Sequence, residues 1–576
     1  LPEGSPVAVV SLISQEVNSV GHPLGARQEP SENERRGLPS ANPTLRILRS
    51  EELPVHDIII RNGTVIDGTR ADRQKADVAL KGDRIAAIGD LSTAAAAHTI
   101  DATDKIVAPG FVDVHNHSDG WLLKTPNFVP KTIQGFTTEV IMADGISYAP
   151  VDPSTRAHWI YYMRALNGLQ MSDYRGWESL ADYMNLLDGR TAQNAITHIP
   201  YAHLRAMAVG WDRQIPDDVQ MEEMLRGVEI GMEEGACGLS TGIDYIAECF
   251  ASTDELVEIC TAMAAQKGLY VTHVRYKKGT LAAIKEAVEI GRRADVPVHI
   301  SHFKGTTPEQ IESYLGYVDE VAVNEVDFSF DVYPYLPGST MLNFMLPYEV
   351  WEDGPLGVLA KLDDPTVRRR FARVIERYVN PLDKIIIAWL PSRDNARFIG
   401  RSLADYVEES GAAPADALCD LLIEENLAVL LVFHHGDDTL VHPFLSHEKY
   451  MMGSDGIYFP DGAVHPRLYG SAARLLGPCV RDHKLFSLED AVYKLSGYPA
   501  ERFGLRQRGR VAEGFYADLV VFDAETVADR ATYQDPHQHS VGVADVLVNG
   551  VPIIRDGQPV EDLGNHLPGR YLKFNA

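Results

Sequence analysis

The sequence has few cysteines, no excess of basic residues and no long apolar run, and each absence narrows what the protein can be. No stretch approaches the run of about 18 apolar residues that a membrane-spanning helix needs. The apolar stretch VAVVSLIS has no basic region before it and no cleavage signature after it, so we predict no signal peptide. Five cysteines are odd in number and widely spaced, which does not describe a disulfide framework. We therefore expect a reducing, cytoplasmic compartment; the cysteines are Cys237, Cys249, Cys260, Cys419 and Cys479.

Acidic residues outnumber basic ones by a wide margin. Lysine and arginine total 53 residues against 81 aspartates and glutamates, so the formal net charge is −28. This balance argues against nucleic acid or an anionic membrane as a partner, since both would repel an acidic protein. With 45% hydrophobic and 23% charged residues, the composition is that of an ordinary globular protein. We expect a small molecule as the partner, and the sequence does not indicate an oligomeric state.

The two ends of the chain differ from its middle. Residues 1–54 are rich in Pro, Ser, Glu, Arg and Asn without apolar periodicity, which predicts a disordered extension. Residues 55–108 and 505–576 consist of short β-rich runs separated by turn pairs such as Asn-Gly. Because neither segment is long enough to bury a sheet face alone, we predict that they pair into one small β-sandwich domain.

The middle region, residues 109–504, predicts an α/β fold. Short apolar strands alternate with helical patterns such as DELVEICTAMAAQKG, which indicates a parallel sheet. Eight such strands predict a (β/α)8 TIM-like barrel, whose active site lies at the carboxyl ends of the strands. The stretch at about 338–441 is far longer than a usual connection and predicts an inserted subdomain or lid. The predicted strands span residues 110–115, 137–144, 195–203, 235–242, 269–275, 296–304, 327–335 and 450–456.

Polar residues gather at the ends of the first, second and eighth predicted strands. The first ends in VDVHNHSDG, and because residues two apart share a face of a strand, Asp113, His115 and His117 are expected to point the same way. The second ends on Asp144 in MADG, and the eighth closes with Asp455 in GSDG. All of them are expected at the same rim of the barrel.

The fifth and sixth strands add two more histidines to this rim. His273 shares a face with Arg275, and His302 shares a face with Lys304. His299, three residues before His302, is expected to face the other side as a packing or surface residue. Four histidines and two carboxylates form a donor set that suits zinc and similar divalent ions; the predicted ligands are His115, His117, Asp144, His273, His302 and Asp455.

The motifs HNH after APGFVDVH, THVR, ISHFKG and GSDG resemble the amidohydrolase superfamily. Within it the chain looks like the N-acyl-D-amino-acid deacylases, or D-aminoacylases, and DVYPYLPGST and HPRLYGS support this resemblance. The resemblance implies a metal-dependent hydrolase that cleaves the linear amide of an N-acyl-D-amino acid by attack of metal-bound hydroxide. The products would be a carboxylic acid and a D-amino acid, and the cofactor would be one or two zinc or other divalent ions.

The resemblance also implies a role for individual residues. His115, His117 and Asp455 would hold the first metal position, and His273 and His302 the second. Asp455 would be the general base and acid. The residues implied in binding the substrate carboxylate or lining the pocket are Lys304, Tyr333, Ser339, Tyr245, Arg275 and Arg467. Deacylases of this kind usually have Asn-Cys-Gly after the second strand, where this chain has Asp144. A carboxylate can bridge two ions, so the number of metals is left open.

Three further alternatives follow from the sequence. Cys237 could replace the missing cysteine ligand, although a free cysteine is commonly just buried. The same fold and metals could open a cyclic amide, as in hydantoinase-like or dihydroorotase-like enzymes. A non-catalytic metal-binding scaffold is the third alternative, and it would be expected to lack a ligand or the acid/base residue. The acyl group and the amino-acid side chain cannot be read from the sequence.

Overall fold

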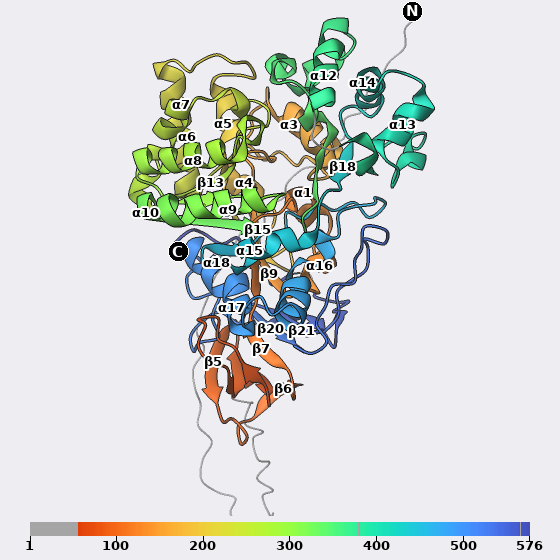
Figure 1. The fold of residues 1–576 in the computed structure, drawn as a ribbon. Helices are drawn as coiled ribbons and strands as arrows, with labels where there is room; N and C mark the ends of the chain where they lie inside the picture. The colour runs from red at the N-terminus through yellow and green to blue at the C-terminus, as the bar shows by residue number, and fades with distance from the viewer. Residues whose placement is uncertain (1–55, 378–380, 565) are drawn as a thin grey trace, which may run out of the picture. The chain divides into compact units, whose positions relative to one another are not determined.

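The computed structural model describes residues 56–377, 381–564 and 566–576. The extension predicted for residues 1–54 lies outside the described residues. The chain from Pro54 to Ala576 forms one compact unit, and its elements are shown in Figure 1.

Within the described residues, eight parallel strands form a closed barrel. Successive strands pair in parallel, and the third one is interrupted at His198, where β10 ends and the two-residue β11 (Ile199–Pro200) takes over the pairing with β12. The barrel closes where the Val114 amide donates to the Met452 carbonyl over 3.3 Å and Asn116 pairs with Gly456. The predicted barrel is confirmed; its strands are β8 (Phe111–Asp113), β9 (Phe136–Ile141), β10 (Asn194–Thr197), β12 (Gly238–Gly242), β13 (Leu269–His273), β14 (Val298–Ile300), β15 (Phe328–Val332) and β19 (Tyr450–Met452).

The barrel is filled by apolar side chains below its mouth. Val112, Val140, Val271 and Met451 belong to one buried cluster, and Phe503 packs into the same cluster. Because both faces of each strand are covered, every residue of β9, β12, β13 and β15 is buried, including polar ones such as Glu139 and Asp331. Buried polar side chains need a partner, so those gathered at the strand ends call for a functional explanation.

Helices cover the outside of the barrel. In α8 the buried residues recur three and four positions apart, as an amphipathic helix requires. Helix α6 begins after Asp217, whose carboxylate accepts from the Gln220 amide over 2.9 Å, and ends at Gly235, whose φ of 108° suits glycine. The main covering helices are α3 (Arg156–Tyr162), α4 (Leu180–Asn185), α5 (Tyr201–Ala208), α6 (Asp218–Glu234), α7 (Thr253–Thr261), α8 (Thr280–Ala294) and α9 (Pro308–Tyr317).

A long segment separates β15 from β19 and has its own antiparallel sheet. Strand β18 lies between β16 and β17, and α12 and α14 pack together beside this sheet (Figure 1). The short 3-10 helix η7 (Leu342–Met345) follows β16 directly. The other elements are β16 (Gly338–Met341), α11 (Gly354–Lys361), α12 (Pro365–Arg377), β17 (Ile385–Trp389), α13 (Leu403–Ser410), α14 (Pro414–Glu424) and β18 (Leu430–Phe433).

The two chain ends meet in one of two further sheets, as predicted, and the other sheet contains strands from the N-terminal end alone. Strand β20, near the C terminus, pairs antiparallel with β7, which leads into the barrel. Leu80, Val107, Val521 and Leu547 belong to one apolar cluster between the strands. The seven-stranded sheet has the order β23-β22-β21-β20-β7-β2-β3 and the four-stranded sheet β5-β4-β1-β6; the two-residue strands are β2 (Thr64–Val65), β3 (Gln74–Lys75) and β23 (Gln558–Pro559). Their longer strands are β1 (His56–Arg61), β4 (Asp77–Lys81), β5 (Arg84–Gly89), β6 (Ala96–Asp101), β7 (Ile106–Pro109), β20 (Leu519–Phe522), β21 (Val543–Val548) and β22 (Val551–Arg555).

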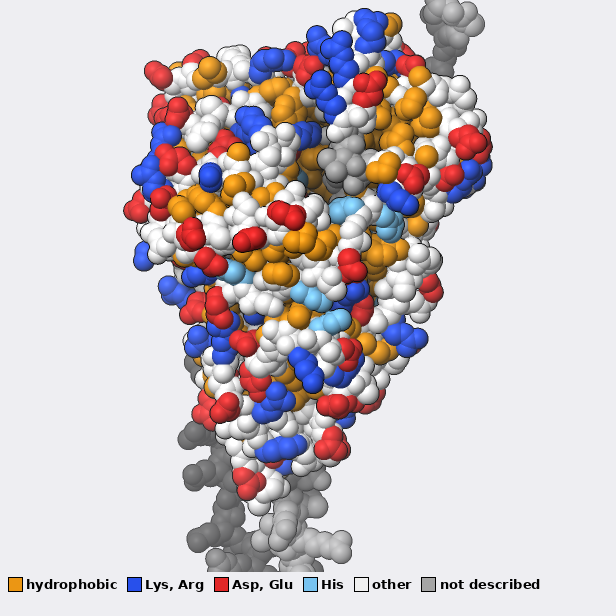
Figure 2. All heavy atoms as spheres, in the orientation of Figure 1, with side chains coloured by type: hydrophobic (Ala, Val, Ile, Leu, Met, Phe, Trp, Pro, Cys, Tyr) orange, Lys and Arg blue, Asp and Glu red, His pale blue; other side chains and the backbone are white. Residues whose placement is uncertain are grey.

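The surface carries charges of both signs. On the face shown in Figure 2, acidic and basic side chains are interspersed. None of the helices in the described part of the chain is both long enough and apolar enough to span a bilayer.

Candidate metal centre

Side chains from the ends of several barrel strands converge on one cavity of about 350 Å³. Five of the six predicted metal ligands line it, and the sixth, His115, is completely buried beside them. The structure thus brings together residues separated by up to 340 positions in the chain. The cavity wall also includes Tyr245, Lys304, Tyr333, Ser339, Phe344 and Phe433.

His115, His117 and Asp455 form the first group of candidate ligands. His117 Nε2 lies 3.2 Å from Asp455 Oδ1, and His115 Nε2 lies 3.9 Å from the same oxygen. One ligand atom from each residue lies within 4.8 Å of the others. Three buried donors at this spacing can share one metal ion.

Asp144 lies between this group and the second one. Its Oδ1 is 3.5 Å from His115 Nε2 and 3.9 Å from His302 Nε2, and its Oδ2 is 3.7 Å from His117 Nε2. His273 Nδ1 lies 3.1 Å from His302 Nε2. The two oxygens of Asp144 therefore face histidines of both groups, which is the arrangement that a bridging carboxylate needs.

Left-handed backbone turns aim three of these residues into the mouth. Asp144, His302 and Asp455 have φ angles of 56°, 38° and 49°, and each follows the end of a strand. Non-glycine residues adopt this conformation at a cost of about 1–3 kcal/mol, and such residues cluster at functional sites.

These turns explain why the expected side of His299 was wrong, although His299 is a packing residue as predicted. The period-two alternation ends with β14 at Ile300, and the left-handed turn at His302 swings that side chain back over the barrel mouth. His299 also faces the barrel interior, where its Nε2 lies 2.9 Å from Asp331 Oδ2. It is completely buried, so it is not a surface residue.

The expectation for Asp113 was also wrong. Its carboxylate pairs closely with Lys131 and accepts from the Ser454 amide over 2.7 Å, instead of facing the cavity with His115 and His117. The strand ends at Asp113, and the chain leaves regular alternation directly after it. The pair of Asp113 and Lys131 holds the loop of Asp455 against the first strand.

Asp331 is a site residue that sequence reasoning missed. Its Oδ2 lies 3.6 Å from His115 Nδ1, and its Oδ1 accepts from the His302 amide over 2.9 Å. The Asp331 carboxylate thus contacts one candidate ligand of each group, His115 and His302. The available signal was an aspartate inside the apolar run FSFDV.

Asp244 was missed as well. Its Oδ2 lies 3.8 Å from His273 Nε2 and accepts from the Lys277 amide over 3.1 Å. Its Oδ1 accepts a short hydrogen bond from the Tyr348 hydroxyl. Asp244 therefore connects a candidate ligand to the segment inserted between β15 and β19.

The electrostatics of the centre favour added positive charge. Burial opposes protonation of His115, yet the carboxylates of Asp144 and Asp331 raise its pKa well above the ordinary value. Burial also disfavours the charged form of Asp144, but the nearby histidines hold its pKa well below the ordinary value. Both ring nitrogens of His115 and Oδ1 of Asp144 are buried without a hydrogen-bond partner. A divalent cation would satisfy His115 Nε2 and Asp144 Oδ1 and supply the charge, while His115 Nδ1 faces Asp331.

The predicted substrate residues separate into two sets. Lys304, Tyr333, Ser339 and Tyr245 line the cavity. Lys304 Nζ donates to the Tyr333 hydroxyl over 2.5 Å, and Ser339 Oγ donates to the Leu431 carbonyl over 2.7 Å.

Arg467 and Arg275 do not line this cavity. Arg467 lies just behind the wall, where its NH1 is 2.8 Å from Asp455 Oδ2 and its guanidinium covers the ring of Tyr333. Arg275 instead binds Glu286 and three backbone carbonyls, including that of Ala251 over 2.9 Å. Arg275 therefore stabilises the fold around the site and is not proposed as a substrate contact.

Cys237 is placed away from the candidate ligands. Its Sγ lies 3.2 Å from the Thr197 carbonyl oxygen and 3.2 Å from His198 Nδ1, inside the apolar cluster of the barrel. Burial raises the pKa of the thiol well above its ordinary value, which disfavours the thiolate that a metal requires.

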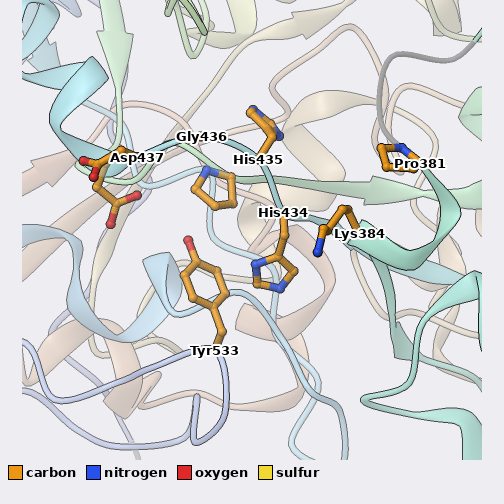
Figure 3. Close-up of a pocket in the computed structure, with 9 residues that line it drawn as sticks. Pro381, Lys384, His434, His435, Gly436, Asp437 and Tyr533 are labelled. Carbon is orange, nitrogen blue, oxygen red and sulfur yellow. The ribbon is translucent and has the colours of Figure 1, made fainter.

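A second cavity of about 750 Å³ adjoins the first (Figure 3). His435 lines both cavities, whereas His434, Lys384 and Tyr533 line only the second. The segment that ends β18 therefore forms part of the wall between them.

Comparison with known proteins agrees with this geometry. The model of the amidohydrolase family matches residues 98–351 and 445–554. The D-aminoacylase of Alcaligenes xylosoxydans xylosoxydans is 35% identical over 506 residues, which cover 86% of this chain and 94% of that protein. The N-acyl-D-glutamate deacylase of the same organism is 34% identical over 526 residues, covering 90% and 97%.

A solved structure matches this chain in fold and about a third of its aligned residues are identical. The crystal structure of N-acyl-D-glutamate deacylase from Bordetella bronchiseptica matches with a TM-score of 0.76 and 32% identity, over 90% of this chain and 99% of that one. That structure is complexed with zinc and with a phosphonate inhibitor that mimics the tetrahedral intermediate of the reaction.

Proposed function

Because the chain belongs to the amidohydrolase family, in its N-acyl-D-amino-acid deacylase branch, we propose that it hydrolyses N-acyl-D-amino acids with the help of divalent metal. The reaction cleaves a linear amide bond to a carboxylic acid and a D-amino acid. The observation that carries this proposal is the cavity that five of the six candidate metal ligands and the half-buried Lys304 line together, with His115 buried beside it.

The residues present fit one or two zinc ions. Neutral imidazoles and carboxylates are the donors that zinc prefers among nitrogen and oxygen ligands. His115, His117 and Asp455 would hold the first ion, and His273 and His302 the second, with Asp144 between them. The unpartnered buried atoms of His115 and Asp144 support this assignment, since such atoms are costly unless they bind something.

Replacement of Asp331 should weaken metal binding without removing a ligand. The Asp331→Asn variant keeps the side-chain shape but loses the charge that faces His115 Nδ1. Partners of this kind typically contribute about 10- to 100-fold to metal affinity, so we expect a loss of that size in a zinc titration followed by calorimetry. Asp319→Asn, at an exposed aspartate, is the matched control. Unchanged affinity in Asp331→Asn would show that this carboxylate does not orient His115.

Asp455 is placed to move the proton. A zinc ion in such a site lowers the pKa of bound water to about 7 and polarises a carbonyl group. Although burial opposes ionisation, the guanidinium of Arg467 and the hydrogen bond with His117 hold the pKa of Asp455 well below its ordinary value. The carboxylate is therefore ionised at neutral pH. It would accept a proton from the attacking water and return it to the departing nitrogen.

Lys304 is placed to bind the carboxylate of the substrate. Within the described residues its ammonium group bonds to the Tyr333 hydroxyl and the Pro337 carbonyl, and no carboxylate pairs with it. Burial, together with the nearby charge of Arg467, lowers the pKa of Lys304 to about 7. A bound carboxylate would restore the charged form and fix the amide above the metal ligands. Ser339 and Tyr333 complete this end of the cavity.

Removal of the ammonium group should therefore impair substrate binding. We expect Lys304→Met to lower kcat/KM for an N-acetyl-D-amino acid by about 100-fold or more, since a buried charge partner is lost. Most of the loss should appear in KM, while the bound metal stays the same. Lys278→Met, at an exposed lysine of the same face, should behave as wild type. A near-normal KM in Lys304→Met would place the substrate carboxylate elsewhere.

A substrate panel tests the proposed function itself. Purified protein loaded with zinc is expected to release free amine from N-acetyl-D-amino acids more rapidly than from their L enantiomers. Hydantoin and dihydroorotate serve as cyclic amides in the same panel. Opening of the rings alone would support the cyclic amide alternative, and hydrolysis of nothing by metal-loaded protein would support the non-catalytic scaffold.

The cellular setting is proposed from charge and cysteine chemistry. All five cysteines are buried and unpaired, as is usual in a reducing compartment such as the cytoplasm. The net charge of −28 disfavours nucleic acid and anionic membranes as partners. We propose a cytoplasmic enzyme whose partner is its small-molecule substrate.

A further inference from the structure

We propose that the reaction cavity selects N-acyl-D-amino acids whose side chain carries no charge, and that Phe344 is a residue that determines this selectivity. This inference rests on the proposed function and narrows its substrate class. The relatives that this chain resembles include a D-aminoacylase and deacylases for both acidic D-amino acids. Membership of this branch therefore does not decide whether the side chain of the substrate is charged.

The supply of positive charge limits the substrate to one carboxylate. Lys304 is the one lysine or arginine among the described residues that line the cavity. Arg467, behind the wall, already pairs with Asp455 over 2.8 Å. Lys277, outside the mouth, donates to the Phe344 carbonyl over 2.8 Å and lies over the Phe344 ring. The α-carboxylate that every N-acyl-amino acid carries would pair with Lys304. A second carboxylate, on the side chain, would then have no cation to pair with.

One part of the cavity wall is aromatic. Phe344, from the helix η7, lies with its ring centre 5.3 Å from that of Tyr245 and 6.0 Å from that of the candidate ligand His273. Phe433, at the end of β18, also lines the cavity. Groups attached to the reacting amide on this side would contact apolar ring faces, which favour aliphatic or aromatic side chains. The bond from Lys277 to its backbone fixes Phe344 in this position.

His435 does not supply the missing charge. Its Nδ1 is buried without a hydrogen-bond partner, and burial together with Lys304 lowers its pKa to about 4. In Figure 3 the His435 ring points away from His434 and Lys384, which face the second cavity. Lys384 is therefore separated from the reaction cavity by the chain segment at the end of β18.

A second carboxylate in this cavity would lose part of its hydration without gaining a cationic partner. An unpaired buried charge in a binding site typically costs about 100-fold or more in affinity. A neutral side chain of the same size would escape this cost. The comparison of a charged side chain with its neutral amide therefore isolates the proposed effect from differences in size.

The test compares N-acetyl-D-glutamine with N-acetyl-D-glutamate, and N-acetyl-D-methionine with both, on zinc-loaded full-length protein. We expect kcat/KM for the glutamine and methionine derivatives to exceed that for the glutamate derivative by about 100-fold or more. Equal or greater activity on the glutamate derivative would overturn the inference while leaving the proposed function intact. Absence of activity on all three, at any substrate concentration, would overturn the proposed function itself.

Phe344 is tested by adding the missing charge. The Phe344→Arg variant should raise the ratio of glutamate to glutamine activity by at least about tenfold, since a cation would then face the side chain. Phe344→Leu keeps the wall neutral and should leave the ratio as in wild type, which separates the effect of charge from that of ring loss. An unchanged ratio in a folded Phe344→Arg protein, with wild-type metal content, would remove Phe344 from the proposed role.

Discussion

The Asp455→Asn variant is expected to retain its fold and much of its metal but to lose about 10²- to 10⁴-fold in kcat, the usual contribution of a general acid and base. Asparagine has nearly the same shape and tolerates the left-handed φ of 49° at this position. Its amide can still offer an oxygen toward His117, yet it cannot accept the proton of the attacking water. Steady-state rates on N-acetyl-D-methionine and metal analysis of the same preparation measure both effects.

A matched control separates the chemistry at Asp455 from general damage. Asp295 is exposed and also has a left-handed φ, of 56°, at the end of α8. Asp295→Asn should therefore keep the wild-type rate. Near-normal hydrolysis by Asp455→Asn, with a normal melting temperature in both variants, would contradict the assigned role of Asp455.

The Asp144→Asn variant is expected to bind fewer metal ions per chain, and its affinity for the remaining metal should be more than about 100-fold weaker. The expected effect is larger than for Asp331→Asn because the substitution removes a metal ligand, whereas Asp331 only contacts ligands. Asp144 faces His115, His117 and His302 with its two oxygens. Without the negative charge of Asp144, the three histidines lose the anionic group that helps to bind a cation between them. Metal content after dialysis against buffered zinc, together with kcat/KM, measures the result.

The Asp144→Cys variant is the informative comparison at the same position. A thiolate restores the ligand that related deacylases usually carry, but a single sulfur replaces two separate oxygens. We expect this variant to recover one tightly bound zinc ion and to hold the second ion less firmly than wild type does. Equal metal content in wild type, Asp144→Asn and Asp144→Cys would show that Asp144 is not a ligand.

The sequence by itself determined the architecture and the chemical character of the site. Apolar runs alternating with amphipathic helices predict a parallel barrel, because strands buried on both faces are rich in apolar residues. Histidines and aspartates interrupt these runs at strand ends, where polar atoms are tolerable only if something binds them. Local composition was sufficient for these conclusions and for the expectation that the two chain ends pair; the structure makes that pairing between β7 and β20.

Only the tertiary structure decided which polar residues share the cavity and what they do there. The alternation rule failed between Asp113 and His115 and between His299 and His302, because it holds only within a strand, and β8 ends at Asp113 and β14 at Ile300. Asp331 and Asp244 act through partners that are distant in sequence, so no local pattern marks them. The same holds for Arg275, whose guanidinium donates to backbone carbonyls that only the fold brings close to it. Directions of side chains after a strand end depend on backbone turns and long-range contacts, which the order of residues alone does not reveal.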